Sequence, residues 1–214
     1  LVAAPPDGSG LNPLLWDSGM QVHPPMLLTG YMSFTIPFAF ATSILAAGRV
    51  SQLWLREMRN WMLIAWAIQS AGLLLGAWWA YTTLGWGGFW GWDPVENSAL
   101  LPLLPMTAFV HSLMVQERRG MLKLWNLALV FAAFALAVFG TFNVRSGLVV
   151  SVHAFALSDV GPYFLGLLAV TLAASIVLLG WRSGRLRADH DFESLASRES
   201  ALIVNNYLFT VIAL

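Results

Sequence analysis

The feature of this sequence that most limits its possible folds is a series of long, uncharged, mostly apolar runs. Each is close to the roughly 20 residues that an α-helix needs to cross a bilayer. We therefore predict an all-α, polytopic transmembrane helix bundle that forms a single membrane domain over residues 1–214. The runs occupy residues 26–47, 61–82, 98–115, 124–142 and 162–181, with a sixth, partial run at 201–214.

The composition agrees with a membrane protein and disfavours other classes. Of the 214 residues, 58% are hydrophobic and 10% are charged, whereas a soluble domain carries roughly a quarter charged residues. The net charge is zero, so nothing indicates a nucleic-acid partner. The chain has no cysteine and therefore no thiol for disulfides or metal ligation. Because it begins at Leu1 and stops inside an apolar run, we expect it to be an internal piece of a longer protein.

The basic residues predict how the spans are oriented in membrane lipid. All lysines and arginines except Arg145 fall in connecting segments on one side, at 48–60, 116–123 and 182–200. The positive-inside rule makes that side cytoplasmic. The outer loops are then 1–25, 83–97 and 143–161.

Prolines predict irregular places within this arrangement. Pro37 should kink the first span, and Pro102 and Pro105 should disturb the outer end of the third. Residues 143–161 are too short and too broken to span again, so we expect a loop with an interfacial helix there.

One outer segment, Trp86–Asn97, reads W-G-G-F-W-G-W-D-P-V-E-N. Asp93, Pro94 and Glu96 match the N-cap, first and third positions of a new helix, which is the pattern of a capping box. This capping role explains the two carboxylates more simply than acid–base catalysis does. The glycines permit tight folding and the aromatic rings offer flat faces, so the segment suits a large, flat, apolar ligand.

Two of the four histidines fall on the outer side. His23 precedes the first span and His153 precedes the fifth. Imidazoles that flank an aromatic platform suit axial ligation of haem iron. From spacing alone, ordinary interfacial histidines are an equally good interpretation.

The other two histidines differ in depth. His111 lies within the third span, towards the inner half, where an ionisable side chain is costly and marks a candidate functional site. Ligation of a buried haem and a hydrogen bond to a neighbouring helix both remain open. His190 stands among charged residues of a cytoplasmic loop, and we expect it to be solvated.

Arg145 is the basic residue on the outer side. It could form a bidentate contact with an anionic group such as a haem propionate. A salt bridge to Asp93, Glu96 or Asp159 is an equal alternative.

The Trp-rich segment closely resembles the WWD signature of the haem-handling protein family. Two further motifs, H-P-P-M-L-L-T-G-Y at His23 and G-T-F-N-V-R-S-G-L-V-V-S-V-H-A-F-A around His153, point to its CcmF branch of cytochrome c-type biogenesis proteins. R-E-S-A-L-I-V-N-N also resembles that branch. The similarity covers essentially the whole chain, with its motifs in the family's order.

The resemblance implies two haem sites. Haem substrate would bind at the outer WWD site with His23 and His153 as iron ligands, and haem b would lie in the membrane with His111 as one ligand and its partner beyond Leu214. The outer haem would also contact the Trp-rich segment and Arg145. The segment residues concerned are Trp86, Gly87, Gly88, Phe89, Trp90, Trp92 and Asp93.

The implied function is that of a cytochrome c haem lyase or synthase subunit in the bacterial inner membrane, with the WWD loop facing the periplasm. Haem would arrive on the chaperone CcmE and be positioned for thioether attachment to the C-x-x-C-H motif of apocytochrome c, held by CcmH- or CcmI-type partners. Quinol is a candidate electron donor. Two alternatives are a haem exporter, which should carry polar groups at mid-membrane, and a quinol-oxidising cytochrome b, which needs paired intramembrane histidines.

Overall fold

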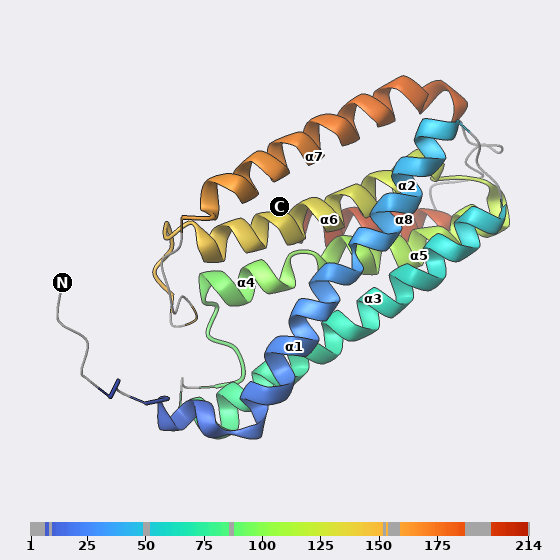
Figure 1. Ribbon diagram of the computed structural model, residues 1–214. Coiled ribbons are helices and arrows are strands. Elements are labelled where there is room, and N and C mark those ends of the chain that lie inside the picture. The colour runs from blue at the N-terminus through green and yellow to red at the C-terminus, as the bar shows by residue number, and fades with distance from the viewer. Residues whose placement is uncertain are drawn as a thin grey trace.

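The computed structural model describes residues 7–8, 10–48, 52–85, 88–151, 153, 159–186 and 198–213. All regular structure in these residues is helical, and five segments are long and apolar enough to cross a membrane (Figure 1). The all-α, polytopic fold predicted from the sequence is confirmed. The helices are α1 Ser18–Ser33, α2 Thr35–Ala47, α3 Gln52–Trp79, α4 Pro94–Leu100, α5 Leu103–Arg119, α6 Lys123–Arg145, α7 Gly161–Arg182 and α8 Arg198–Ala213.

Most helices extend beyond the predicted runs, and the largest differences lie at the starts of the first two. Residues 18–25, expected in the outer loop, belong to α1, so His23, Pro24 and Pro25 are helical. Asp17 caps this helix by accepting a hydrogen bond from the Gly19 amide at 2.7 Å. Likewise α3 begins at Gln52, inside the predicted cytoplasmic loop 48–60. Hydropathy marks the apolar part of a helix, whereas caps and packing decide where it begins.

The expected irregularities occur next to the prolines. The chain turns at Phe34, between α1 and α2, and Pro37 follows one turn later. Because Pro37 has no N–H to donate to the Ser33 carbonyl, the helix breaks on the N-terminal side of the proline. Leu101 and Pro102 form a turn that separates α4 from α5.

Helices α1 and α3 pack against each other along a stripe where backbones approach closely (Figure 1). A Cβ atom added at Gly72 of α3 would lie 2.9 Å from the Leu27 Cα atom of α1. Small residues allow such close approach between membrane helices, where van der Waals packing provides much of the association energy. This contact fixes α1 against α3 close to His23, which matters for the site described below.

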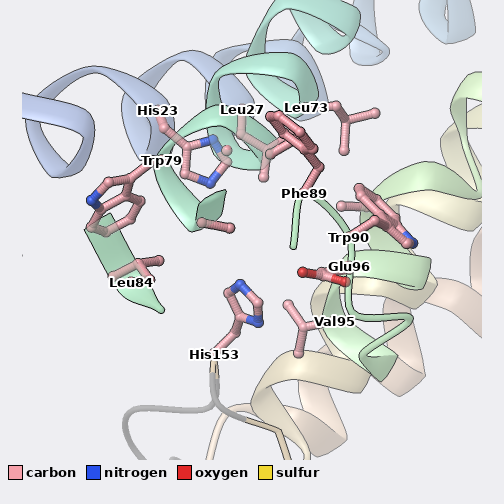
Figure 2. A pocket seen from close by; sticks show the side chains of 14 residues that line it. His23, Leu27, Leu73, Trp79, Leu84, Phe89, Trp90, Val95, Glu96 and His153 are labelled. Carbon is pink, nitrogen blue, oxygen red and sulfur yellow. The ribbon is translucent and has the colours of Figure 1, made fainter. Parts of the chain in front are cut away.

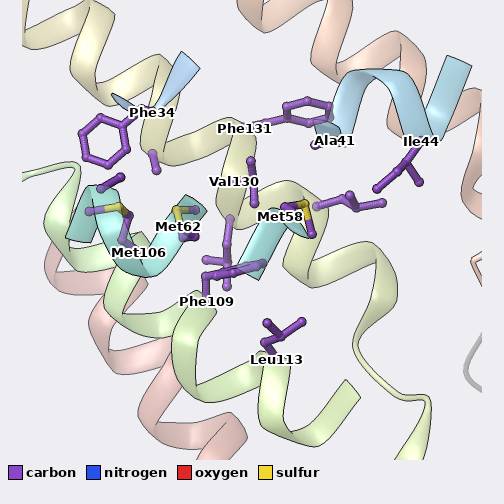
Figure 3. Close-up of a cluster of buried hydrophobic side chains, with 14 of the residues drawn as sticks. Phe34, Ala41, Ile44, Met58, Met62, Met106, Phe109, Leu113, Val130 and Phe131 are labelled. Carbon is purple, nitrogen blue, oxygen red and sulfur yellow. The ribbon is translucent and has the colours of Figure 1, made fainter. Parts of the chain in front are cut away.

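A buried apolar cluster joins α2, α3, α5 and α6 (Figure 3). Phe34, Met58, Met62, Met106 and Phe109 are among its fully buried members. A polar contact lies nearby, between α5 and α6, where the buried Asn126 side chain donates to Gln116 Oε1 at 2.5 Å and also contacts Ser112. The cluster holds the centre of the bundle together, while α7 packs on α6 and α8 on α5 at the periphery.

Candidate functional site

The Trp-rich segment ends in the predicted capping box. Asp93 accepts a hydrogen bond from the Val95 amide at 3.0 Å, and Glu96 accepts from the Asp93 amide at 3.3 Å. Glu96 also accepts from the Gly91 amide at 2.8 Å. The carboxylates therefore satisfy backbone donors that the start of α4 would otherwise leave unpaired. This arrangement fixes the C-terminal half of the Trp-rich segment to α4.

Trp92 has an unusual backbone in this segment. Its φ angle is 54°, in the left-handed region that bulky residues rarely adopt. Its carbonyl accepts a hydrogen bond from the Asn97 side chain at 3.1 Å, and its own side chain is 72% exposed. The side chain of Trp92 is not part of the cavity wall described next, whereas that of Trp90 is.

A cavity lies between α1, α3 and the Trp-rich segment, at the end of the bundle that the charge pattern predicts to be outer (Figure 2). It encloses about 470 Å³ including its opening to solvent, with room for water-sized molecules in about 60 Å³ of it. Its walls are largely apolar and aromatic, with His23 and His153 among them, together with Trp79, Leu84, Phe89 and Trp90. A ligand of haem size requires wall side chains to shift, and Phe89, which is 54% exposed, is the least confined of these aromatics.

His23 is held by α3. Its Nδ1 atom lies 2.8 Å from the Gly72 carbonyl oxygen. A carbonyl can accept but not donate, so Nδ1 carries the proton and Nε2 keeps its lone pair. The ring fits closely against Gly76, where an added Cβ atom would lie 2.4 Å from the His23 Cε1 atom. The helix pair α1–α3 thus sets both the tautomer and the position of this imidazole.

His153 is held by the capping carboxylate. Its Nδ1 atom lies 3.1 Å from Asp93 Oδ2, which also accepts a hydrogen bond from Ser151 Oγ at 2.7 Å. The His153 amide in turn donates to Ser151 Oγ at 2.9 Å. Burial raises the pKa of Asp93, but hydrogen bonds from Ser151, Val95 and His153 outweigh it, so this pKa lies below its usual value. The ionised carboxylate accepts a hydrogen bond from Nδ1 of His153, so a metal would bind this ring through Nε2.

These two imidazoles form a donor set that suits a haem iron. The rings lie across the open space from each other in Figure 2. Each Nδ1 is engaged by a protein oxygen, so a metal would bind each ring through Nε2, which is the usual arrangement of metal-ligating histidines. Among the residues that the structure describes, no group of three or more His, Asp or Glu side chains could hold a bare metal ion. Two axial nitrogens are enough when a macrocycle supplies the remaining ligands.

A π-helical turn at Ala80–Leu84, which the hydropathy pattern does not predict, completes the wall. Residues five apart lie about 140° apart around an α-helix, but the i→i+5 hydrogen bonds of a π-helix bring them onto nearly the same side. Trp79 and Leu84 consequently both line the cavity. The turn also places Tyr81 against Phe89, with ring centroids 4.1 Å apart and planes 6° apart. The aromatic run before Gly85 is the one sequence signal that points to an unusual helix end here. The hydropathy of that run favours an ordinary helix end.

Other predicted site residues are not brought to the cavity. Arg145 is the exposed last residue of α6, and no ion pair joins it to Asp93, Glu96 or Asp159 within the described part of the chain. The salt-bridge alternative is therefore not realised. A Cβ atom added at Gly88 would have no atom within 4 Å, and Gly88 does not line the cavity. Trp86, Gly87 and His190 lie outside the described residues.

His111 lies on α5, away from the outer cavity. Its ring is half-buried, and its Nδ1 atom donates to the Thr107 carbonyl of the same helix at 2.8 Å. Helix α5 packs against α8. His111 thus occupies a separate place in the bundle.

Comparisons with known proteins agree with one another. Residues 1–150 match the family model described as cytochrome C assembly protein. The chain is 48% identical over 207 residues to cytochrome c-type biogenesis protein CcmF of Pseudomonas aeruginosa, covering 96% of this chain and 31% of that protein. It is 45% identical over 205 residues to CcmF of Escherichia coli K12, covering 95% and 32%.

A solved structure titled "Cytochrome c Heme Lyase CcmF" has the same fold. It aligns with a TM-score of 0.76 at 35% sequence identity, covering 99% of this chain and 31% of that one. The chain therefore spans about a third of the length of the relatives that it matches.

Proposed function

The chain belongs to the cytochrome c assembly protein family, and from that premise we propose that its outer cavity binds haem between His23 and His153 during cytochrome c maturation. One observation carries the proposal. Both imidazoles have Nδ1 engaged by a protein oxygen and lie across an apolar, aromatic cavity. The carboxylate-bound and carbonyl-bound histidines would bind iron through Nε2, and the aromatic walls suit the macrocycle.

In this function the cavity positions a substrate. Each of two cysteine thiols of a C-x-x-C-H motif in apocytochrome c adds across a haem vinyl group: sulfur bonds to one vinyl carbon and hydrogen to the other, so no oxidant is consumed. The chain has no cysteine, so both thiols come from the apocytochrome. The residues around the cavity would hold haem with its vinyl groups accessible, and catalysis would come from proximity and orientation.

The same proposal includes partners and location. Five apolar spans and the basic connecting segments support a place in the bacterial inner membrane, with the cavity facing the periplasm. A haem chaperone of the CcmE type would deliver the substrate there, and CcmH- or CcmI-type proteins would present the apocytochrome. The position of the cavity at the outer end of the helices favours handover on that side over export through the bundle.

A second site is proposed within the membrane. His111 would ligate a haem b, with its partner ligand supplied from beyond Leu214. That haem would keep the substrate iron reduced, with quinol as electron donor. Because an imidazole at this depth is costly unless it is used, His111 is the residue that supports this part of the proposal.

The outer site is tested by replacing its histidines in the full-length protein. We expect His23→Ala and His153→Ala each to lower the haem content of the purified protein and the yield of holocytochrome c. His190→Ala is a matched control, because that histidine is expected in a solvated cytoplasmic segment. Haem content and yield unchanged in both cavity variants would refute the ligand assignment.

A further inference from the structure

The N-cap of α4 and the loop that carries His153 meet at one carboxylate. Asp93 Oδ2 accepts from the Val95 amide at 3.0 Å, from Ser151 Oγ at 2.7 Å and from His153 Nδ1 at 3.1 Å. A capping role requires the first of these contacts and leaves the other two unexplained. Those two come from residues 58 and 60 positions later in the chain, so they are features of the folded site.

We propose that Asp93 is a positioning residue for His153, in addition to being a helix cap. The carboxylate holds a proton on Nδ1 and fixes the ring, so that iron would bind His153 through Nε2. Ser151 supports the same geometry, because its hydroxyl donates to Asp93 and accepts from the His153 amide. The inference deepens the function proposed above and rests on it.

The two candidate ligands differ in the charge of the group that accepts a hydrogen bond from Nδ1. The Nδ1 proton of His153 faces an anionic carboxylate, whereas that of His23 faces the neutral Gly72 carbonyl. A carboxylate behind an imidazole makes the ring a stronger donor and orients it. Hydrogen bonding behind an axial ligand is also one of the means by which a protein sets the potential of a haem. Asp93 should therefore favour the ferric state of bound haem.

Two substitutions separate capping from positioning. Serine caps a helix about as well as aspartate, but its side chain is shorter and cannot keep the contact with His153. Asparagine also caps well, and its amide oxygen can take the place of Oδ2 without the negative charge. Asp93→Ser therefore removes the positioning contact, and Asp93→Asn removes the charge.

The experiment titrates ferric haem into full-length protein purified without haem. We expect Asp93→Ser to weaken haem binding by about 10- to 100-fold, the usual cost of losing a partner of a metal ligand. In a His153→Ala background the same substitution should change affinity by less than about twofold, because the group through which Asp93 acts is gone. An equal loss in both backgrounds, or no loss in the first, would overturn the inference.

A second readout does not depend on affinity or on whether the serine variant folds. Haem bound to Asp93→Asn should have a more positive reduction potential than haem bound to the unaltered protein. An unchanged or more negative potential would overturn the role of the carboxylate charge. Failure of the proposed function is recognised separately, because His153→Ala alone would then leave haem affinity unchanged.

Discussion

The imidazole of His23 occupies the space that a side chain at Gly76 would fill. A Cβ atom at residue 76 would lie 2.4 Å from the His23 Cε1 atom and 3.0 Å from Nε2. Both distances are shorter than atoms tolerate without movement, and the ring is also tied to the Gly72 carbonyl. A glycine on one membrane helix therefore sets the position of a candidate iron ligand on another.

We predict that Gly76→Ala displaces His23 and weakens haem binding by at least about tenfold, in line with the cost of losing support for a metal ligand. The measurement is ferric-haem titration of the full-length protein, followed by absorbance. Gly166→Ala on α7 is the matched control, because no atom lies within 4 Å of its added Cβ atom and alanine is the better helix former. Equal haem affinity in the two variants would show that haem binding does not depend on the fit of His23 against Gly76.

We predict that His111→Ala removes the proposed membrane haem while the cavity lined by His23 and His153 stays folded. His111 lies on α5, whereas His23 and His153 line a cavity formed by α1, α3 and the Trp-rich segment. The measurement is the absorbance spectrum of purified full-length protein, with haem titration to check the outer site. A haem spectrum that His111→Ala leaves intact would exclude His111 as a ligand.

We predict that the stability contributed by Asp93 depends on pH in one direction. The pKa of Asp93 is lower in the folded protein than its ordinary value, so unfolding favours proton uptake by this group. Its contribution is complete above the unfolded-state pKa of about 3.9 and is lost as the pH falls through the lower, folded-state value. The test compares thermal unfolding of the unaltered protein and of Asp93→Asn from neutral to acidic pH.

The two proteins should differ most above about pH 4 and converge at lower pH, where Asp93 becomes protonated. Asp7→Asn removes a carboxylate from the N-terminal segment and serves as the matched charge control. A difference that grows as the pH falls would contradict the assignment, since it would require a raised pKa in the folded state.

Local patterns in the sequence predict much of this structure. Uncharged runs identify the spans, Pro37 places the break in the first, and the order Asp93, Pro94, Glu96 predicts the capping box. These features depend on residues within a few positions of one another. Helix bounds are less predictable because caps and close packing decide them, as with α1, which begins at Ser18 and carries His23 inside the helix.

The contacts that build the cavity depend on residues far apart in sequence. The tie between Asp93 and His153 crosses 60 positions, so the capping pattern explains one role of Asp93 and conceals the other. The periodicity of hydropathy does not predict the π-helical turn. The extra residue in the turn changes which side chains share a face of the helix, but it leaves the hydropathy of each residue the same. Arg145 illustrates the converse: its charge predicts an outer partner, but its place at the end of α6 leaves it exposed.

The two candidate ligands belong to parts of the protein that have different surroundings. His23 stands on α1, whose position is set by packing with α3 inside the bilayer, while His153 is set by a loop and a helix cap at the aqueous surface. Their nitrogens face a common space when both halves are in place. A change in the lipid and a change in the aqueous medium can therefore each displace one imidazole without the other, so the proposed haem coordination would require both parts to be assembled.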